Sequence, residues 1–198
     1  MVHRPAGAFA VVKGVFCVGG RGTQGTYILR IALRDAARLA LGRFQGGRVF
    51  DFPPGTYLYV GSALGRTGSS TLGRRLLRHA CRREGKAHSL LPALEAFFAL
   101  SPPARKRLHW HVDYLLELPQ ADLEAAFLFA YPHPLEARLS RFLLEFPEVQ
   151  PHPPGAGAGD DPGGSHLLRV VAASLWWSRF PQVLNQWLQS LPETRSTA

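Results

Sequence analysis

Residues 57–63 (YLYVGSA) and 74–79 (RRLLRH) carry most of what this sequence says about its fold. In the first stretch tyrosines alternate with aliphatic residues, which predicts a β-strand with Tyr57 and Tyr59 on the same face. The second stretch predicts a helix that carries arginines and His79. Aromatic hydroxyls beside guanidinium groups can hold a phosphodiester, so this strand and helix indicate a nucleic-acid partner.

Ser70 or Thr71 is suited to cap this helix, which we expect to run to about Arg83. Residues three or four apart lie together on a helix. The apolar residues therefore form one stripe, and a neighbouring stripe holds Arg75, Arg78, His79 and Arg82.

Extended and helical patterns alternate along the rest of the chain. We expect further strands over residues 8–18, 26–33, 48–52, 123–130 and 166–171. We expect further helices over residues 36–41 (capped by Asp35), 90–100, 134–145 and 174–191, the last interrupted at Pro181. Residues 147–164 are rich in proline and glycine and are expected to form a loop.

Composition limits the classes of protein that remain. The chain has 198 residues and is 46% hydrophobic, enough for one compact domain, and its formal charge of +9 favours a polyanionic partner. Cys17 and Cys81 form no CxxC pair, so a thiolate zinc site is excluded and a reducing, cytoplasmic location is expected. Lys13 interrupts the apolar N-terminal run, and no stretch is apolar enough to span a membrane. No oligomeric state is predicted.

Several blocks, in this order, resemble the GIY-YIG nuclease superfamily: Gly25-Thr26-Tyr27, Tyr59-Val60-Gly61, Arg75 to His79, and Glu136. The finer likeness is to an uncharacterised branch, found alone or fused to an endonuclease III domain. That branch is expected to carry GxYLYVGSA, RxxRH and HWHxDYL blocks, a glutamate-led helix and SHL. Here they correspond to residues 55–63, 75–79 and 109–115, to Glu136, and to residues 165–167. The likeness covers roughly residues 22–170.

The resemblance implies an α/β fold of the α+β type, with a small, mainly antiparallel sheet flanked by helices. It divides the chain into an N-terminal segment (1–21), a nuclease-like domain (22–171, with an insertion at about 84–108) and a Trp-rich tail (172–198).

It also implies Mg²⁺-dependent cleavage of phosphodiester bonds, in DNA rather than RNA, for repair or processing. The implied catalytic residues are Tyr27, Tyr59, Arg75, His79 and Glu136, with Glu136 holding the metal ion. The implied nucleic-acid contacts are Arg74, Arg78, Arg82 and Arg83.

The roles follow from the chemistry of the side chains. A tyrosine hydroxyl of lowered pKa takes or relays a proton, with His79 as its partner or as an alternate base. Arg75 binds a phosphate oxygen, and a single carboxylate with waters suits Mg²⁺. Tyr57 also follows a Gly-Thr pair, but Tyr27 is preferred because Tyr57 shares a strand with Tyr59.

The chain departs from the branch pattern where cysteines are expected, at Ala137, Asp161 and Gly163. This departure keeps open a second hypothesis, a nucleic-acid-binding module that has the fold but does not cut.

A third hypothesis is a zinc hydrolase built on His109, His111 and Asp113, which would share one face of a strand. In a helix, His111 would point elsewhere, and a structural hydrogen-bonding role is preferred. His166 either lies near the site or packs at the start of its strand. We expect the tail tryptophans to pack on the domain rather than mediate self-association.

Overall fold

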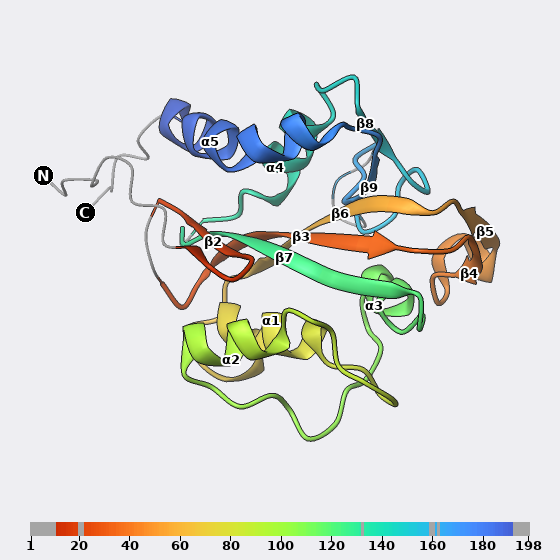
Figure 1. The fold of residues 1–198 in the computed structure, drawn as a ribbon, viewed down its shortest axis with the longest axis horizontal. Coiled ribbons are helices and arrows are strands. Elements are labelled where there is room, and N and C mark those ends of the chain that lie inside the picture. The colour runs from red at the N-terminus through yellow and green to blue at the C-terminus, as the bar shows by residue number, and fades with distance from the viewer. Residues whose placement is uncertain (1–10, 20–21, 132, 159–160, 162, 192–198) are drawn as a thin grey trace, which may run out of the picture.

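The computed structural model describes residues 11–19, 22–131, 133–158, 161 and 163–191. Its centre is a seven-stranded sheet (Figure 1). The strands lie in the order β1 (Val11–Val12), β2 (Val15–Val18), β7 (Ala121–Phe129), β3 (Gly25–Leu33), β6 (Gly55–Ala63), β9 (Leu167–Val170), β8 (Val149–Pro151). Among the strands of the described residues, only β2 and β7 pair in parallel, so the α+β fold with a mainly antiparallel sheet is confirmed.

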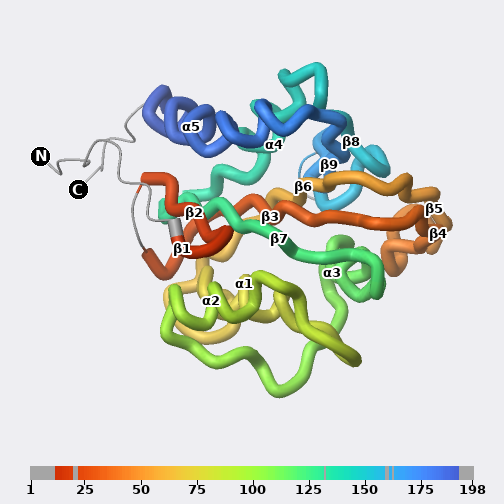
Figure 2. The backbone as a smooth tube through the Cα atoms, viewed as in Figure 1, coloured from red at the N-terminus to blue at the C-terminus, as the bar shows by residue number. Residues whose placement is uncertain are grey.

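Helices cover both faces of the sheet, as the tube in Figure 2 shows. On one face lie α1 (Leu72–Ala80), α2 (Leu91–Phe98) and α3 (His111–Leu116), and on the other lie α4 (Glu136–Leu143) and α5 (Ser174–Ser190). The period-two pattern of β6 explains how one strand serves both cores. Tyr57 and Tyr59 face the α1–α3 side, and Leu58 and Val60 face the α4–α5 side.

The predicted helix over residues 36–41 is wrong, because this segment forms β4 (Ala37–Ala40). It pairs with β5 (Val49–Phe52) in a two-stranded ribbon linked by a 3₁₀ turn (Phe44–Gly47). A helix of six residues is unstable without packing support. The backbone hydrogen bonds between β4 and β5 stabilise the extended conformation instead.

Other boundaries also differ from the expectations. Residues 8–18 do not make one strand, since β1 and β2 are separated by a turn in which Lys13 and Gly14 have positive φ. The segment 147–164 contains β8 at its start. The helix expected to reach Arg83 ends at Ala80, whereas α5 runs on through Pro181 because Phe180 and Leu184 are buried in the core around it.

The tail helix packs on the domain, as expected. Phe180, Leu184 and Leu188 of α5 are buried in the same core as α4. Within the described part of the chain, no helix is both long and apolar enough to cross a membrane.

Candidate active site

The strand register brings two tyrosines together on the α1–α3 face of the sheet. Tyr27 of β3 lies directly opposite Gly61 of β6, so Tyr59 is its diagonal neighbour on the same face. The two ring centroids are 6.4 Å apart. Gly61 leaves the space that the Tyr27 ring fills.

A chain of hydrogen bonds runs from Tyr27 into the protein. The Tyr27 hydroxyl lies 2.9 Å from Nε2 of His79, and Nδ1 of His79 lies 3.1 Å from Oδ1 of Asp113. The Tyr59 ring lies 6.1 Å from the His79 ring, centroid to centroid. All three members of the Tyr27–His79–Asp113 chain are buried.

The carboxylate fixes the tautomer of the imidazole. Contacts with His79 and Arg78 hold the pKa of Asp113 far below its usual range although burial opposes this, so its oxygens only accept hydrogen bonds. Nδ1 of His79 must therefore carry the proton that is donated to Asp113. Burial lowers the pKa of His79 to about 4, so at neutral pH its unprotonated Nε2 accepts a hydrogen bond from the Tyr27 hydroxyl.

Asp113 is a member of the site for which the sequence analysis preferred a structural hydrogen-bonding role and did not predict a bond to His79. Nη2 of Arg78 binds both carboxylate oxygens at 2.9 Å, and Oδ2 accepts the backbone N–H groups of His109 and Trp110 at 2.8 and 3.0 Å. The HWHxDYL block was the sequence feature that could have pointed to this role. Its aspartate is the third residue of α3, where its carboxylate accepts backbone N–H groups that have no partner within the helix.

Arg75 and Glu136 come from different elements and meet at Ser62. Nη1 of Arg75 donates to the Ser62 carbonyl at 2.7 Å, and the Ser62 hydroxyl donates to Oε2 of Glu136. The Trp110 ring supports this arginine, with the guanidinium carbon 4.3 Å from the ring centroid. Neither the role of Ser62 nor this contact of Trp110 was predicted from the sequence.

Glu136 begins α4, close to the phenols. Its charge is one cause of the raised pKa of both Tyr27 and Tyr59. Oε1 of Glu136 lies 3.1 Å from Nδ1 of His166, which is buried at this end of the site. Of the two readings of His166, its position favours the one near the site.

The residues present fit one Mg²⁺ ion that keeps most of its water shell. The Glu136 side chain is 24% exposed and offers the hard oxygen ligands that Mg²⁺ prefers. Among the described residues, no three His, Cys, Asp or Glu side chains gather as a metal site. An ion held by Glu136 would therefore take most of its ligands from water.

The structure thus brings Tyr27, Tyr59, Arg75, His79 and Glu136 into one neighbourhood. The expectation of a tyrosine with a lowered pKa is wrong, because burial raises the pKa of both Tyr27 and Tyr59. Tyr27 is 1% exposed, Tyr59 2% and His79 0%. Arg75 and Glu136, by contrast, are partly exposed at the rim of the cluster.

A family model described as a domain of unknown function, DUF123, matches residues 26–187. The chain belongs to the DUF123 family. No curated protein and no solved structure matches it.

In this DUF123 domain Tyr57 has different surroundings from Tyr27. Its hydroxyl donates to the Pro53 carbonyl at 2.7 Å, and its ring lies against Phe52 and His152. The hydrogen bond to His79 therefore belongs to Tyr27, the tyrosine preferred from the sequence.

The arginines expected to bind nucleic acid differ in how they are engaged. Arg74 is exposed and donates to the Ser101 carbonyl, and Arg83 is more than half exposed beside Glu117. Arg78 is bound to Asp113, to the Arg107 carbonyl and to the Trp110 ring, which leaves its guanidinium occupied inside the domain.

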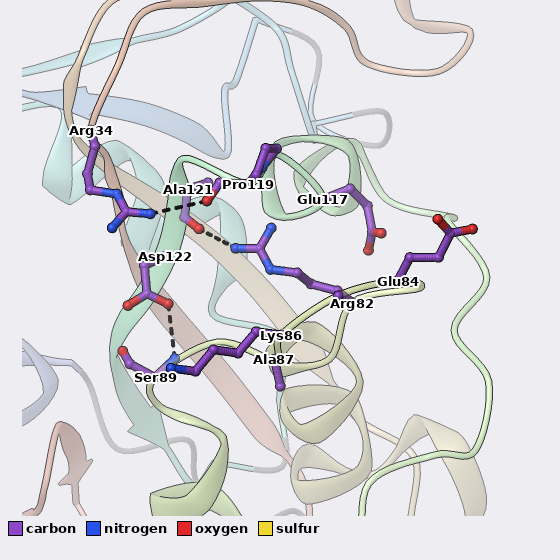
Figure 3. A pocket seen from close by; sticks show the side chains of 11 residues that line it. Arg34, Arg82, Glu84, Lys86, Ala87, Ser89, Glu117, Pro119, Ala121 and Asp122 are labelled. Atoms are coloured by element: carbon purple, nitrogen blue, oxygen red, sulfur yellow. Dashed lines mark hydrogen bonds between the residues drawn. The ribbon is translucent and has the colours of Figure 1, made fainter.

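Arg82 is also engaged within the domain, beside a pocket of about 380 Å³ (Figure 3). It donates to the carbonyls of Leu118 and Ala121, and Arg34 donates to the carbonyl of Pro119. The two arginines hold the turn before β7, and neither Tyr27 nor Tyr59 lines this pocket.

The three residues of the zinc hypothesis separate in the structure. They lie at the start of a helix rather than on a strand, and Asp113 points to His79. Nδ1 of His111 accepts the backbone N–H of Gly157 at 2.7 Å, while the His109 ring lies edge-on to Trp110. A strand face shared by all three is therefore wrong, and Asp113 has the structural hydrogen bonds that were preferred for this block.

Proposed function

We propose that this DUF123 domain hydrolyses phosphodiester bonds of nucleic acid, in DNA rather than RNA, as a Mg²⁺-dependent nuclease of the GIY-YIG type. The supporting observation is the Tyr27–His79–Asp113 hydrogen-bond chain, which ends beside the partly exposed Arg75 and Glu136. A role in DNA repair or processing and a cytoplasmic location are part of the same proposal.

In this proposal the buried chain moves a proton. Water attacks phosphorus and gives its proton to the Tyr27 oxygen as the phenol proton passes to Nε2 of His79. A concerted transfer suits phenols whose pKa is raised, because no free phenolate has to form. Asp113 stabilises the resulting imidazolium, as the carboxylate does in other relays of this kind. The bond between phosphorus and the leaving oxygen breaks, that oxygen takes a proton from solvent, and His79 returns its proton to solvent.

The residues at the rim bind the phosphate. Arg75 offers a planar guanidinium to a non-bridging oxygen, and the Trp110 ring keeps it in place. Glu136 would hold a Mg²⁺ ion, which would neutralise charge that builds on the phosphate. Tyr27 and Tyr59 are at most 2% exposed. Catalysis therefore requires that substrate binding open a path from this rim to the two phenols.

The same burial favours one alternative, a module that binds nucleic acid without cutting it. In that case the Tyr27–His79–Asp113 chain only stabilises the fold. Exposed arginines such as Arg74 would contact phosphates, and the affinity would fall steeply with salt.

Cleavage of labelled nicked, branched and single-stranded DNA in Mg²⁺ tests the proposal. We expect Mg²⁺-dependent products that vanish with EDTA and fall at least about 100-fold in Arg75→Ala and Glu136→Gln. Arg179→Ala, an exposed arginine on α5, and Glu145→Gln, an exposed carboxylate just beyond α4, serve as matched controls that should retain cleavage.

The outcomes separate the two functions. Equal cutting by wild type and both site variants would reject the assigned residues. Salt-sensitive binding with no cleavage in Mg²⁺, Mn²⁺ or Ca²⁺ would instead support the binding module.

A further inference from the structure

A cavity of about 660 Å³ lies next to the candidate active site, between the 3₁₀ turn that links β4 and β5 and the start of α3. The residues of its lining that matter here are Arg43, Phe44, His109, His111 and Tyr114. Arg43 and His109 are exposed, and the other three are half-buried. None of these five residues was assigned a role in the proposed hydrolysis.

Trp110 connects this cavity to the phosphate-binding rim. It stands between His109 and His111 in the chain, and the His109 ring packs edge-on against it at a centroid distance of 4.6 Å. The Arg75 guanidinium also contacts this tryptophan, with its carbon 4.3 Å from the Trp110 ring centroid. One tryptophan therefore contacts both the cavity lining and the arginine at the rim.

A second connection runs through Gly157. Its backbone N–H donates to Nδ1 of His111, which lines the cavity. A Cβ on Gly157 would come within 2.9 Å of His166 and 3.4 Å of the Tyr59 ring, so this glycine also lies against the site. The cavity is thus joined to the phosphate-binding rim by Trp110 and to the phenols by Gly157.

The lining suits a flat heteroaromatic group attached to an anionic backbone. The Phe44 and His111 rings lie 4.9 Å apart, centroid to centroid, and Tyr114 adds a third ring. Because Nδ1 of the His111 ring accepts a hydrogen bond, its Nε2 carries the proton and is a donor for a base edge. Arg43 adds an exposed positive charge for a neighbouring phosphate.

We infer that this cavity binds a nucleobase that has left the stack, one nucleotide from the phosphate held by Arg75. The inference rests on the proposed function and narrows its substrate to DNA with an unpaired base, such as a flap, a mismatch or a single strand. Aromatic side chains bind unstacked bases with little sequence preference, and enzymes gain access to such bases most easily where pairing is already lost.

Binding measured in EDTA, where no cleavage occurs, tests the pocket separately. The probes are two duplexes that differ at one position, which holds either an unpaired 2-aminopurine or an abasic site. We expect wild-type protein to bind the 2-aminopurine duplex about tenfold more tightly and to quench its fluorescence by stacking.

Phe44→Leu removes an aromatic face but keeps apolar volume, and Arg43→Gln removes an exposed charge. Phe44→Leu should reduce the preference to near one, whereas Arg43→Gln should weaken binding of both probes. The matched controls are Phe146→Leu on the opposite face of the sheet and Arg38→Gln on β4, and both should behave as wild type.

Equal binding of the two duplexes by wild type, or an unchanged preference in Phe44→Leu, would overturn the inference. Cleavage of the same duplexes in Mg²⁺ is scored independently. A retained base preference without cleavage would reject the proposed hydrolysis and support the base-binding pocket. Cleavage without the preference would support the hydrolysis and reject the pocket.

Discussion

The Tyr27 ring lies so close to the α-carbon of Gly61 that a methyl group there would come within 2.6 Å of the phenol oxygen. The two residues are direct partners in the β3–β6 register. Gly61 is thus the residue that lets a tyrosine lie flat across its own sheet, with its hydroxyl directed to His79.

Replacing Gly61 with alanine should displace the Tyr27 ring. We expect Gly61→Ala to lower the free energy of unfolding by about 1–3 kcal/mol and to reduce cleavage, because overpacking pushes the phenol away from His79. Urea unfolding and the DNA cleavage assay measure the two effects. Gly22→Ala, where the nearest contact would be a looser 3.3 Å, should cost less, and an equal cost for both would contradict this account.

Removing the Tyr27 hydroxyl should impair function more than stability. Tyr27→Phe leaves Nε2 of His79 without its partner, at a cost of about 1–3 kcal/mol, and we expect cleavage to fall about 10²–10⁴-fold. Tyr57→Phe removes a phenol hydrogen bond on the same face of the sheet and should leave cleavage intact. If the two variants cut DNA equally well, Tyr27 has no role in proton transfer.

The protein should lose stability as the pH falls below about 6.5. Burial lowers the pKa of His79 to about 4 and that of His88 to about 4, whereas an unfolded histidine titrates near 6.5. Between these values the unfolded chain binds more protons than the folded protein, so the free energy of unfolding decreases, on the order of 3 kcal/mol per histidine. The lowered pKa of Asp113 adds a further loss in stronger acid.

Thermal unfolding between pH 7.5 and pH 4 measures this loss. The decline in Tm should become shallower in His79→Gln and stay unchanged in His133→Gln, which alters an exposed histidine. A Tm that is flat from pH 7 to pH 4.5 would show that the buried histidines do not govern stability.

Trp110 should be important for both fold and DNA affinity. Its ring faces two guanidinium groups, with the carbons of Arg75 and Arg78 at 4.3 and 4.0 Å from its centroid. Trp110→Leu should cost about 2–3 kcal/mol of stability and weaken DNA binding, and Trp110→Phe should restore part of both. Urea unfolding and filter binding are the measurements. No difference between the leucine and phenylalanine variants would argue against a cation–π contribution.

The tail helix should be an integral part of the domain. Phe180 is buried against Phe127 and Trp176, so Phe180→Ala should cost about 3–5 kcal/mol. Leu175→Ala on the exposed side of α5 should change stability by less than about 0.5 kcal/mol. Similar unfolding curves for both would mean that the tail contributes little to the core.

Local patterns predicted most of the elements and failed where packing against a distant segment decided the conformation. The alternation in β6 and the apolar stripe of α4 predict the right element, because burial on one or both faces determines which residues those positions accept. The extended conformation of residues 37–40 is determined by pairing with β5, whose paired residues lie nine or more positions further along the chain. Local propensity does not include such a partner. Pro181 likewise fails to end α5, since core packing on both sides of it maintains the helix.

The candidate site shows the same division. The alternating tyrosine strand, the basic helix and the block that contains Asp113 could be predicted, because each depends on residues close together in the chain. The three-dimensional structure was needed to show that the preferred Tyr27 bonds to His79, and that Ser62 joins Arg75 to Glu136. Only it showed that the phenols are buried, with raised pKa values. The physical reason is that hydrogen bonds and desolvation depend on which distant segments the sheet register and helix packing bring into contact, and neither is encoded in local periodicity.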